Sequence, residues 1–377
     1  MARVVILGAG IAGMSAAIAL RRLLGDRHEV WVVAQTNRFV WRPSLPWVAF
    51  GLRRPEQIMV PLRPALQRRG IRFAEARVLR IDPHRRHVFT EAGTVAYDVL
   101  LIALGAQQDW DAVPGADRYG HVICRMDGAR RIWEAVQRLD RGTAVFGMTG
   151  TGGCPAPVYE AAFLLDDYLR RCGRRPRVEI CVVTTEPAPL HVVGPAPSRL
   201  MAAELRKRNI HCYPNTPIHG VEAGRVLLAD GRTLPAAFTM VMPPYRGSAA
   251  MQESSELADA RGFVRCDAAL RHPQFPEIFV AGDGAALDTA KTGHHAWLQA
   301  KVAARNIAAF LSGKEATAMF RPQFACNLSI GTAKGLIGFW QPAPPALGNL
   351  QVQFTYAGRP AHWMKVLLER YVLWKIQ

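Results

Sequence analysis

The start of the chain alternates between an apolar run, a glycine-rich turn and an alanine-rich stretch. Residues 3–7 read RVVIL, which is typical of a buried strand, and residues 11–24 read IAGMSAAIALRRLL, which is typical of a helix. Gly8, Gly10 and Gly13 follow the spacing G-x-G-x-x-G. The first glycine permits a sharp turn, the second lets backbone approach a pyrophosphate, and the third lets helix and strand pack closely. This pattern predicts a strand, turn and helix that bind a dinucleotide at the helix N-terminus.

The same pattern begins again near residue 143. TAVFGMTG predicts a strand, GTGGCPAP a turn, and VYEAAFLLDDYLRR a helix whose apolar positions recur every 3.6 residues. Further strands are predicted at EVWVVAQ, VAYDVLLIALGAQ, VEICVVT, TMVMPP and IFVAGDGAAL, the last running into Gly282 and Asp283. We therefore predict an α/β fold with two Rossmann-like dinucleotide-binding domains.

The late turn at Asp283 can offer a carboxylate to the ribityl hydroxyls of a flavin. Two dinucleotide folds followed by such a turn resemble the flavoproteins with two dinucleotide-binding domains. The resemblance implies an FAD-binding domain at residues 1–108, completed by residues 265–312. A second Rossmann-like domain at 109–264 would carry Cys124 and Cys154, and a C-terminal region at 313–377 would carry Cys326 and a membrane-docking helix.

The C-terminal segment AHWMKVLLERYVLWKIQ predicts an amphipathic helix. His362, Lys365 and Glu369 share one face, and apolar side chains fill the other: Trp363, Met364, Leu367, Leu368, Tyr371 and Trp374. Basic residues outnumber acidic ones here, and tryptophan prefers the membrane interface. From the pattern alone, a helix lying on an anionic membrane and a terminal helix packed on its own domain fit equally well.

Composition limits the classes of partner. The 377 residues carry a net charge of +17 with a pI near 10.2, which invites anionic partners. The arginines are spread along the chain without a nucleic-acid-binding signature, so we expect no nucleic acid. No apolar run reaches the roughly 18 residues of a spanning helix. The first strand begins at Arg3 and leaves no room for a secretory leader, so we expect peripheral membrane contact, on a side that the sequence does not give.

The second glycine-rich turn differs from an ordinary cofactor turn. Pro155 and Pro157 remove amide donors that a pyrophosphate needs, so we do not expect NADH as the electron donor. Cys154 precedes the predicted helix, whose N-terminus predicts a lowered thiol pKa and a reactive thiolate. In the first domain, Gln35 stands where an acidic residue usually binds the adenosine ribose, and its amide can still hydrogen-bond there. Cys181 is expected in the core, and no spacing of Cys and His indicates a metal.

Several segments narrow the resemblance. GTGGCPAPVYE resembles the cysteine-bearing turn of the sulfide:quinone oxidoreductases and of the related flavocytochrome c sulfide dehydrogenases. HVICRMDGA and FACNLSIG resemble the segments that carry this family's other two cysteines, here Cys124 and Cys326. EPAPLHVVG resembles a segment whose histidine, here His191, lies on the sulfide side. The C-terminal helix resembles the family's membrane-docking end.

The cofactor that the resemblance implies is FAD. RFVWRPSLPWVAFGLR resembles the segment along FAD, and KTGHHAWLQAKVAARNI resembles the segment along the flavin pyrimidine edge. Lys291 in the latter either stabilises negative charge on the reduced flavin or is a solvated lysine. The candidate FAD-binding residues are Gly8, Gly10, Gly13, Gln35, Arg42, Pro43, Val78, Gly105, Gly282, Asp283, Lys291 and Gly293.

The resemblance also implies a reaction. Cys154 and Cys326 meet over one flavin face as a disulfide or polysulfide bridge, and hydrosulfide opens it to a persulfide and a thiolate. The freed thiolate passes two electrons to the flavin, and a membrane quinone takes them at the opposite face. Cys124 either holds the flavin covalently or assists sulfur release, and His191 either moves protons or is structural. Lys365 is a candidate donor to a quinone carbonyl, or else lies on a solvated helix face.

Three other functions compete with sulfide:quinone oxidoreduction. A flavocytochrome c flavoprotein would pass electrons to a haem subunit, but the missing leader and the amphipathic tail count against it. A type II NADH dehydrogenase conflicts with the second turn. A flavin sensor without turnover would not need three cysteines in matching segments. The oligomeric state stays open, including a homo-oligomer.

Overall fold

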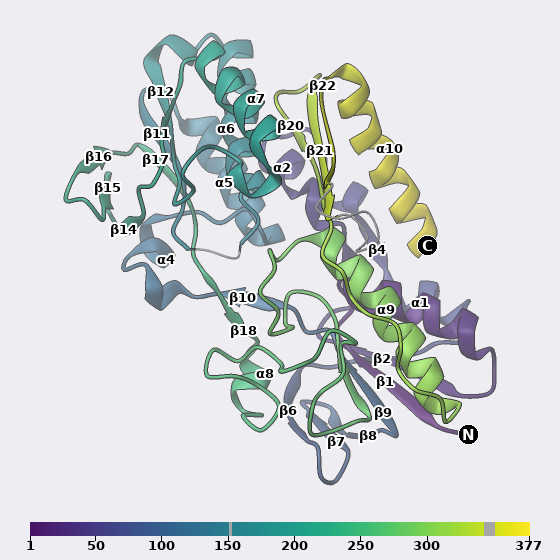
Figure 1. Cartoon of the computed structure of the whole chain (residues 1–377). Helices are drawn as coiled ribbons and strands as arrows, with labels where there is room; N and C mark the ends of the chain where they lie inside the picture. The colour runs from purple at the N-terminus through teal and green to yellow at the C-terminus, as the bar shows by residue number, and fades with distance from the viewer. Residues whose placement is uncertain (151–152, 343–350) are drawn as a thin grey trace.

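The computed structural model of the chain describes residues 1–150, 153–342 and 351–377. Figure 1 shows a lower sheet flanked by α1 and α9, an upper α/β part around β11 and β12, and a C-terminal sheet with α10 beside it. The two predicted Rossmann-like units are confirmed as two separate parallel sheets.

The first sheet has five parallel strands in the order β19–β9–β1–β2–β5. Their bounds are Ile278–Val280 (β19), Val99–Ile102 (β9), Arg3–Leu7 (β1), Glu29–Ala34 (β2) and Arg72–Glu75 (β5). Helices α1 (Ile11–Leu24) and α9 (Gly293–Leu311) pack against each other on one face. Because β19 pairs with β9, the turn that follows β19 reaches the carboxyl edge of this sheet.

Residues of β1 alternate between two cores, as a strand's period of two requires. Val4 and Ile6 belong to the large core that includes residues of α1 and α9. Val5 and Leu7 belong to a second core with Val78 of the antiparallel sheet β6–β7–β8. That sheet has the bounds Val78–Asp82 (β6), His87–Thr90 (β7) and Gly93–Ala96 (β8). Both faces of the parallel sheet are therefore covered, which explains its continuous apolar sequence.

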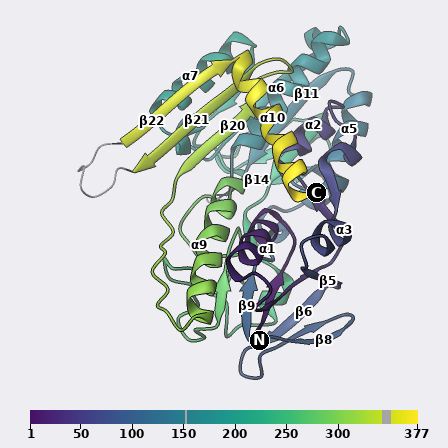
Figure 2. The same ribbon diagram turned by 90° about the vertical axis from the view of Figure 1, so that its right-hand side faces the viewer.

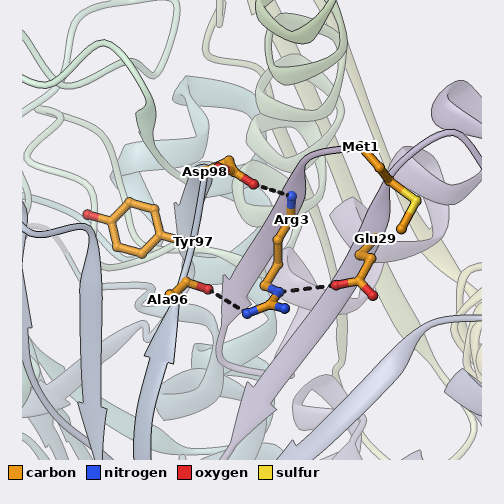
Figure 3. A pocket seen from close by; sticks show the side chains of 6 residues that line it. All are labelled: Met1, Arg3, Glu29, Ala96, Tyr97 and Asp98. Carbon is orange, nitrogen blue, oxygen red and sulfur yellow. Dashed lines mark hydrogen bonds and ion pairs between the residues drawn. The ribbon is translucent and has the colours of Figure 1, made fainter.

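A shallow pocket at the start of β1 holds polar contacts between neighbouring segments (Figure 3). The backbone amide of Arg3 donates to Asp98 Oδ2 at 2.6 Å, and its Nε donates to Glu29 Oε2 at 3.1 Å. Its Nη1 donates to the carbonyl of Ala96 at 3.4 Å. Ligands of open α/β sheets bind at the opposite, carboxyl ends of the strands. These contacts therefore hold the amino-terminal ends of the strands together and lie away from the end of the sheet where a cofactor is expected.

The second sheet has four parallel strands in the order β13–β12–β11–β17. Their bounds are Ile210–Tyr213 (β13), Val178–Val183 (β12), Gly142–Met148 (β11) and Phe238–Met242 (β17). Helices of this part are α5 (Met126–Arg138), α6 (Ala156–Arg171) and α7 (Pro195–Lys207). An antiparallel sheet packs on its other side, formed by β14 (Ile218–Glu222), β15 (Arg225–Leu228) and β16 (Thr233–Pro235).

Shorter elements connect these layers. An antiparallel pair, β10 (Ala106–Gln108) and β18 (Tyr245–Gly247), runs between the two parallel sheets (Figure 1). The other short helices are α2 (Leu45–Ala49), α3 (Leu62–Gln67), α4 (Ala116–Tyr119) and α8 (Ala249–Gln252). Strands β3 (Arg38–Val40) and β4 (Met59–Pro61) pair with each other. The loops also contain five single-turn helices in the described residues: η1 (Arg42–Ser44), η2 (Pro55–Ile58), η3 (Trp110–Ala112), η4 (Arg175–Arg177) and η5 (His191–Val193).

The C-terminal part is an antiparallel sheet, β20 (Phe324–Ser329), β21 (Gly335–Pro342) and β22 (Gln351–Gly358), followed by α10 (Arg359–Ile376). Figure 2 shows α10 at the surface beside these strands. Of the helices in the described ranges, none combines the length and the apolarity needed to cross a bilayer.

Helix α10 is attached by its polar face. Lys365 is buried and its Nζ donates to Glu160 Oε1 of α6, while the Glu369 carboxylate accepts from Ser44 Oγ and, at 2.9 Å, from Arg53 Nε. The apolar face points outward, with exposed side chains at Trp363, Met364, Leu367, Leu368, Tyr371 and Trp374. The helix thus packs on its own domain and still leaves an apolar and aromatic face in solvent.

Candidate active site

The first glycine-rich turn lies at the carboxyl end of β1. Gly8 has φ +98°, in the region that favours glycine, and its amide donates to the carbonyl of Val33 at 2.7 Å. A Cβ on Gly13 would lie 1.9 Å from the Gly8 oxygen, so no side chain fits there. A Cβ on Gly10 would meet nothing within 4 Å, which leaves open space in front of the α1 N-terminus. These are the geometric conditions for a pyrophosphate at this helix end.

Four further predicted cofactor residues lie around the same sheet. Gln35 follows β2 directly and is exposed. Arg42 and Pro43 form the start of η1, with the arginine exposed. Val78 is buried in the core beneath the sheet. The structure therefore leaves Gln35 and Arg42 accessible to a ligand, while the Val78 side chain serves the core.

Two segments meet at the carboxyl edge of β9 and β19. Gly282, with φ +89°, donates its amide to Gln299 Oε1 at 2.6 Å, which ties the turn to α9. A Cβ on Gly284 would lie 3.0 Å from the Gly105 oxygen, so the turns after β9 and β19 touch through backbone. Burial raises the pKa of the half-buried Asp283 carboxyl, and the charges of Arg42 and Lys291 oppose this rise.

The N-terminus of α9 is held close to α1. A Cβ on Gly293 would lie 2.9 Å from Ile11 Cδ1, and the Thr292 side chain caps the helix by accepting from the amide of His295 at 3.1 Å. Lys291 Nζ donates to the carbonyl of Ala285 at 2.6 Å, and burial lowers the pKa of this ammonium. The predicted candidates Lys291 and Gly293 thus lie between the Asp283 turn and the first glycine-rich turn.

The structure brings together three cysteines from distant parts of the chain. Cys154 lies just before α6 and Cys326 lies in β20. A negative charge on Cys124 raises the pKa of Cys154, and one on Cys154 raises the pKa of Cys326, so the thiols form one electrostatic group. Tyr245 Oη donates to Cys124 Sγ at 3.6 Å. All seven cysteines lie in the described part of the chain, and each is a free thiol, so no disulfide joins them there.

The prediction of a lowered thiol pKa at Cys154 is wrong. Burial raises the pKa of this thiol to about 12, and the hydrogen bond from the backbone amide of Ala156 offsets only part of the rise. Burial likewise raises the pKa of Cys124 and of Cys326. A helix end acts locally, whereas the desolvation of a thiolate depends on everything packed around it. Thr151 and Gly152 of the same turn lie outside the described residues.

Two predicted residues lie in unexpected settings. His191 is exposed at the start of η5. Lys365 is buried on the inner side of α10, where its Nζ is bound to Glu160 and lies 4.8 Å from the Trp47 ring centroid. Its positive charge opposes the rise in the pKa of Cys326, which places it near that thiol. Lys365 is therefore not on the solvated helix face that the sequence left as an alternative.

Sequence reasoning missed three groups near the thiols. Glu186 and Glu160 both raise the pKa of Cys326, and Tyr245 hydrogen-bonds Cys124. Glu186 accepts from Tyr159 Oη at 2.7 Å and from the amide of Val192 at 3.1 Å, so it fastens the segment that bears His191. Its position after the second strand of a dinucleotide fold, where acids often bind ribose, was the available signal.

The fold and this site define a class of flavoprotein oxidoreductase. A model of the pyridine nucleotide-disulphide oxidoreductase family matches residues 2–306, and the chain belongs to this family. Over 396 aligned residues it is 28% identical to the sulfide-quinone reductase of Aquifex aeolicus, spanning 99% of this chain and 91% of that relative. The crystal structure of the sulfide:quinone oxidoreductase from that bacterium has a TM-score of 0.92 and 28% identity, covering 100% of this chain and 91% of that one.

A second group of relatives bears on the competing functions. An NADH dehydrogenase-like protein of Mycobacterium tuberculosis is 28% identical over 298 residues, covering 76% of this chain and 73% of that protein. The similarity to the Aquifex protein extends over nearly the whole chain, including β20–β22 and α10. The predicted resemblance to sulfide:quinone oxidoreductases is therefore confirmed.

Proposed function

We propose that the chain oxidises sulfide with bound FAD and passes the electrons to a membrane quinone. The proposal is supported most by the placement of Cys154 just before α6 and of Cys326 in β20, since these two elements pack together and the two thiols influence each other's pKa. The similarity to the Aquifex sulfide-quinone reductase over 99% of the chain supports it independently. The charge of Asp283 acts on Cys154 and the charge of Lys365 acts on Cys326, which is an unusual setting for ordinary core cysteines.

FAD fits the carboxyl edge of the first sheet. The open space before Gly10 and the N-terminus of α1 would hold the pyrophosphate, and Gln35 would meet the adenosine ribose. Asp283 would accept from the ribityl chain, and Lys291 at the start of α9 would lie toward the pyrimidine edge. FAD supplies the two-electron acceptor that the thiols need. The proposal includes three domains: an FAD-binding domain at 1–108 completed by 265–312, a second Rossmann-like domain at 109–264, and a C-terminal region at 313–377.

The sulfur chemistry is assigned to the three thiols. With Cys154 and Cys326 joined through sulfur, hydrosulfide attacks one sulfur, forms a persulfide there, and releases the other cysteine as a thiolate. Lys365 stabilises a negative charge on Cys326, since it opposes the rise in that pKa. Tyr245 donates to Cys124, which would take part in sulfur release or flavin attachment. His191 would exchange protons at the solvent side, because its ring is exposed.

Membrane contact is assigned to the outward face of α10. Trp374 is 71% exposed and Leu367 60% exposed, which is unusual for such side chains on a helix packed against its own domain. Tryptophans and basic residues on one helix favour the interface of an anionic membrane. Because Lys365 is bound to Glu160 and lies near Cys326, on the sulfur side of the proposed site, we assign it to the thiol and not to a quinone carbonyl at the opposite flavin face.

The test is anaerobic addition of sulfide, and separately of NADH, to the FAD-loaded protein while flavin absorbance is followed. Sulfide should bleach the flavin and a soluble quinone should restore it. Reduction by NADH with no response to sulfide would support the NADH dehydrogenase-like relatives instead and overturn the proposal.

A further inference from the structure

The turn between β20 and β21 is gripped by the second parallel-sheet unit. The Asp167 carboxylate of α6 accepts from the amide of Thr332 at 2.6 Å and from its hydroxyl at 3.0 Å. Arg208, at the end of α7, donates to the carbonyl of Ile330 at 3.0 Å and is also paired with Asp167. We refer to Asp167, Arg208 and residues 330–332 as the hairpin clamp.

The clamp rests on a buried carboxylate that binds three arginines. Asp166 is fully buried, and its carboxylate accepts from Arg170 Nε at 2.9 Å, from Arg175 Nε at 2.6 Å and from Arg208 Nη1 at 2.9 Å. The Arg208 guanidinium is therefore bound by the carboxylates of both Asp166 and Asp167. Because a guanidinium is planar and its donors have a fixed geometry, these two contacts fix the direction in which Arg208 donates to the carbonyl of Ile330.

The turn packs closely against Asp167 and Arg208 at Gly331. Gly331 has φ +116°, and a Cβ there would lie 2.7 Å from Asp167 Oδ2 and 2.8 Å from Arg208 Nη2. A glycine is needed at this position both for the backbone conformation and for the approach of the two charged groups. The turn and the clamp are therefore fitted to each other.

The clamp and the thiols lie toward opposite ends of two elements that pack together. Cys154 stands just before α6, and Asp167 lies about 17 Å along that helix from Ala156, at ~1.5 Å per residue. Cys326 lies about 13 Å before Ile330 along β20, at ~3.3 Å per residue. Helix α6 and β20 are in contact. A displacement of the turn would therefore shift Cys326 relative to Cys154.

We propose that the hairpin clamp positions Cys326 against Cys154, making Asp167 and Arg208 positioning residues for the sulfur site. Its relevance to turnover rests on the proposed function, while its effect on the two thiols does not. Bridging two thiols requires their Cα atoms to come within about 7 Å, and a misplacement of 1 Å can cost about 100-fold in rate. The clamp joins α6 directly to the turn, alongside the Lys334–Glu204 pair and the Trp47–Ser329 hydrogen bond that hold the neighbouring residues, and we expect it to contribute to this register.

The test uses Asp167→Asn and Gly331→Ala in the FAD-loaded full chain. Asp140→Asn, which removes the exposed Asp140–Arg177 pair in the same unit, is the matched control. Each protein is reduced, freed of reductant and treated with diamide, a thiol oxidant that takes up the two electrons and two protons that two thiols release when they form a disulfide. Formation of the Cys154–Cys326 bridge is followed by mass spectrometry of the digested protein, with the melting temperature and the FAD content measured in parallel.

Both clamp variants should form the bridge about 10- to 100-fold more slowly than the wild type at 25 °C, while still folded and loaded with FAD. The control should bridge at the wild-type rate. A merely structural clamp would lower the melting temperature and leave the bridging rate of the folded protein unchanged, which would overturn the proposal. Failure of the wild type to bridge would also overturn it. Slow bridging in the variants together with no bleaching of wild-type flavin by sulfide would support the clamp and contradict the proposed function.

Discussion

Replacing Lys365 by methionine tests how α10 is attached. Lys365 is 4% exposed and Glu160 3% exposed, so the variant leaves a carboxylate buried without its counter-charge. Removing one partner of a buried pair costs about 3–5 kcal/mol. The unfolding entropy of a chain of this length is about 0.8 kcal/mol per kelvin, which converts this loss to a fall in melting temperature of roughly 4–6 °C.

The assay is thermal unfolding of the FAD-loaded protein followed by tryptophan fluorescence. Lys314→Met, at an exposed lysine after α9, is the control and should change the melting temperature little. Adding Glu160→Gln to Lys365→Met should recover much of the loss, because the stranded charge is gone. The reasoning is refuted if Lys365→Met matches Lys314→Met, or if the double variant loses the sum of the two single losses.

Three further outcomes are expected. Leu367→Glu with Leu368→Glu should abolish sedimentation with anionic vesicles at an unchanged melting temperature, because both side chains are exposed; retained binding would contradict a role for that face. Burial raises the pKa of Cys181 to about 12 from a usual value of 9.0. As the pH rises above 9, the thiol therefore loses its proton in the unfolded chain but keeps it in the folded one. The free energy of unfolding should then fall by about 1.4 kcal/mol per pH unit between those two values. Cys181→Ala should weaken the alkaline loss of stability measured by urea titration at pH 8 and 10, and an unchanged loss would exclude this thiol as a source. Tyr245→Phe removes a hydrogen bond that lowers the pKa of Cys124, so alkylation of Cys124 by iodoacetamide at pH 8 should slow; an equal rate would contradict that contact.

Local rules predicted the elements of the fold, and long-range packing decided the site. The spacing of Gly8 and Gly13 predicted the first turn correctly, because the close contact between these two glycines involves residues only five positions apart. The two faces of α10 were readable from helical spacing, but which face turns inward depends on Glu160, from another part of the chain. The apolar face points outward because Glu160 binds Lys365 and because Ser44 and Arg53 bind Glu369 on the inner face.

The thiol chemistry shows the same limit. A helix after Cys154 is visible in the sequence, yet the burial that raises its pKa comes from the whole fold. Tyr245 lies in a segment that carries no motif for sulfur chemistry, and Glu186 begins the segment EPAPLHVVG, whose resemblance drew attention to its histidine and not to its acid, so only the structure places these two residues near the cysteines. The meeting of Cys154 and Cys326 was implied by a resemblance and not by spacing.

Reduction of the flavin by sulfide in a Cys326→Ser variant tests the central claim most directly. Cys181→Ser, at a buried cysteine in β12, serves as the control for loss of a thiol. With equal FAD content, sulfide should bleach the wild type and the control, while the Cys326→Ser flavin should stay oxidised and still accept electrons from dithionite. Bleaching of Cys326→Ser by sulfide at the wild-type rate would contradict a Cys154–Cys326 redox site.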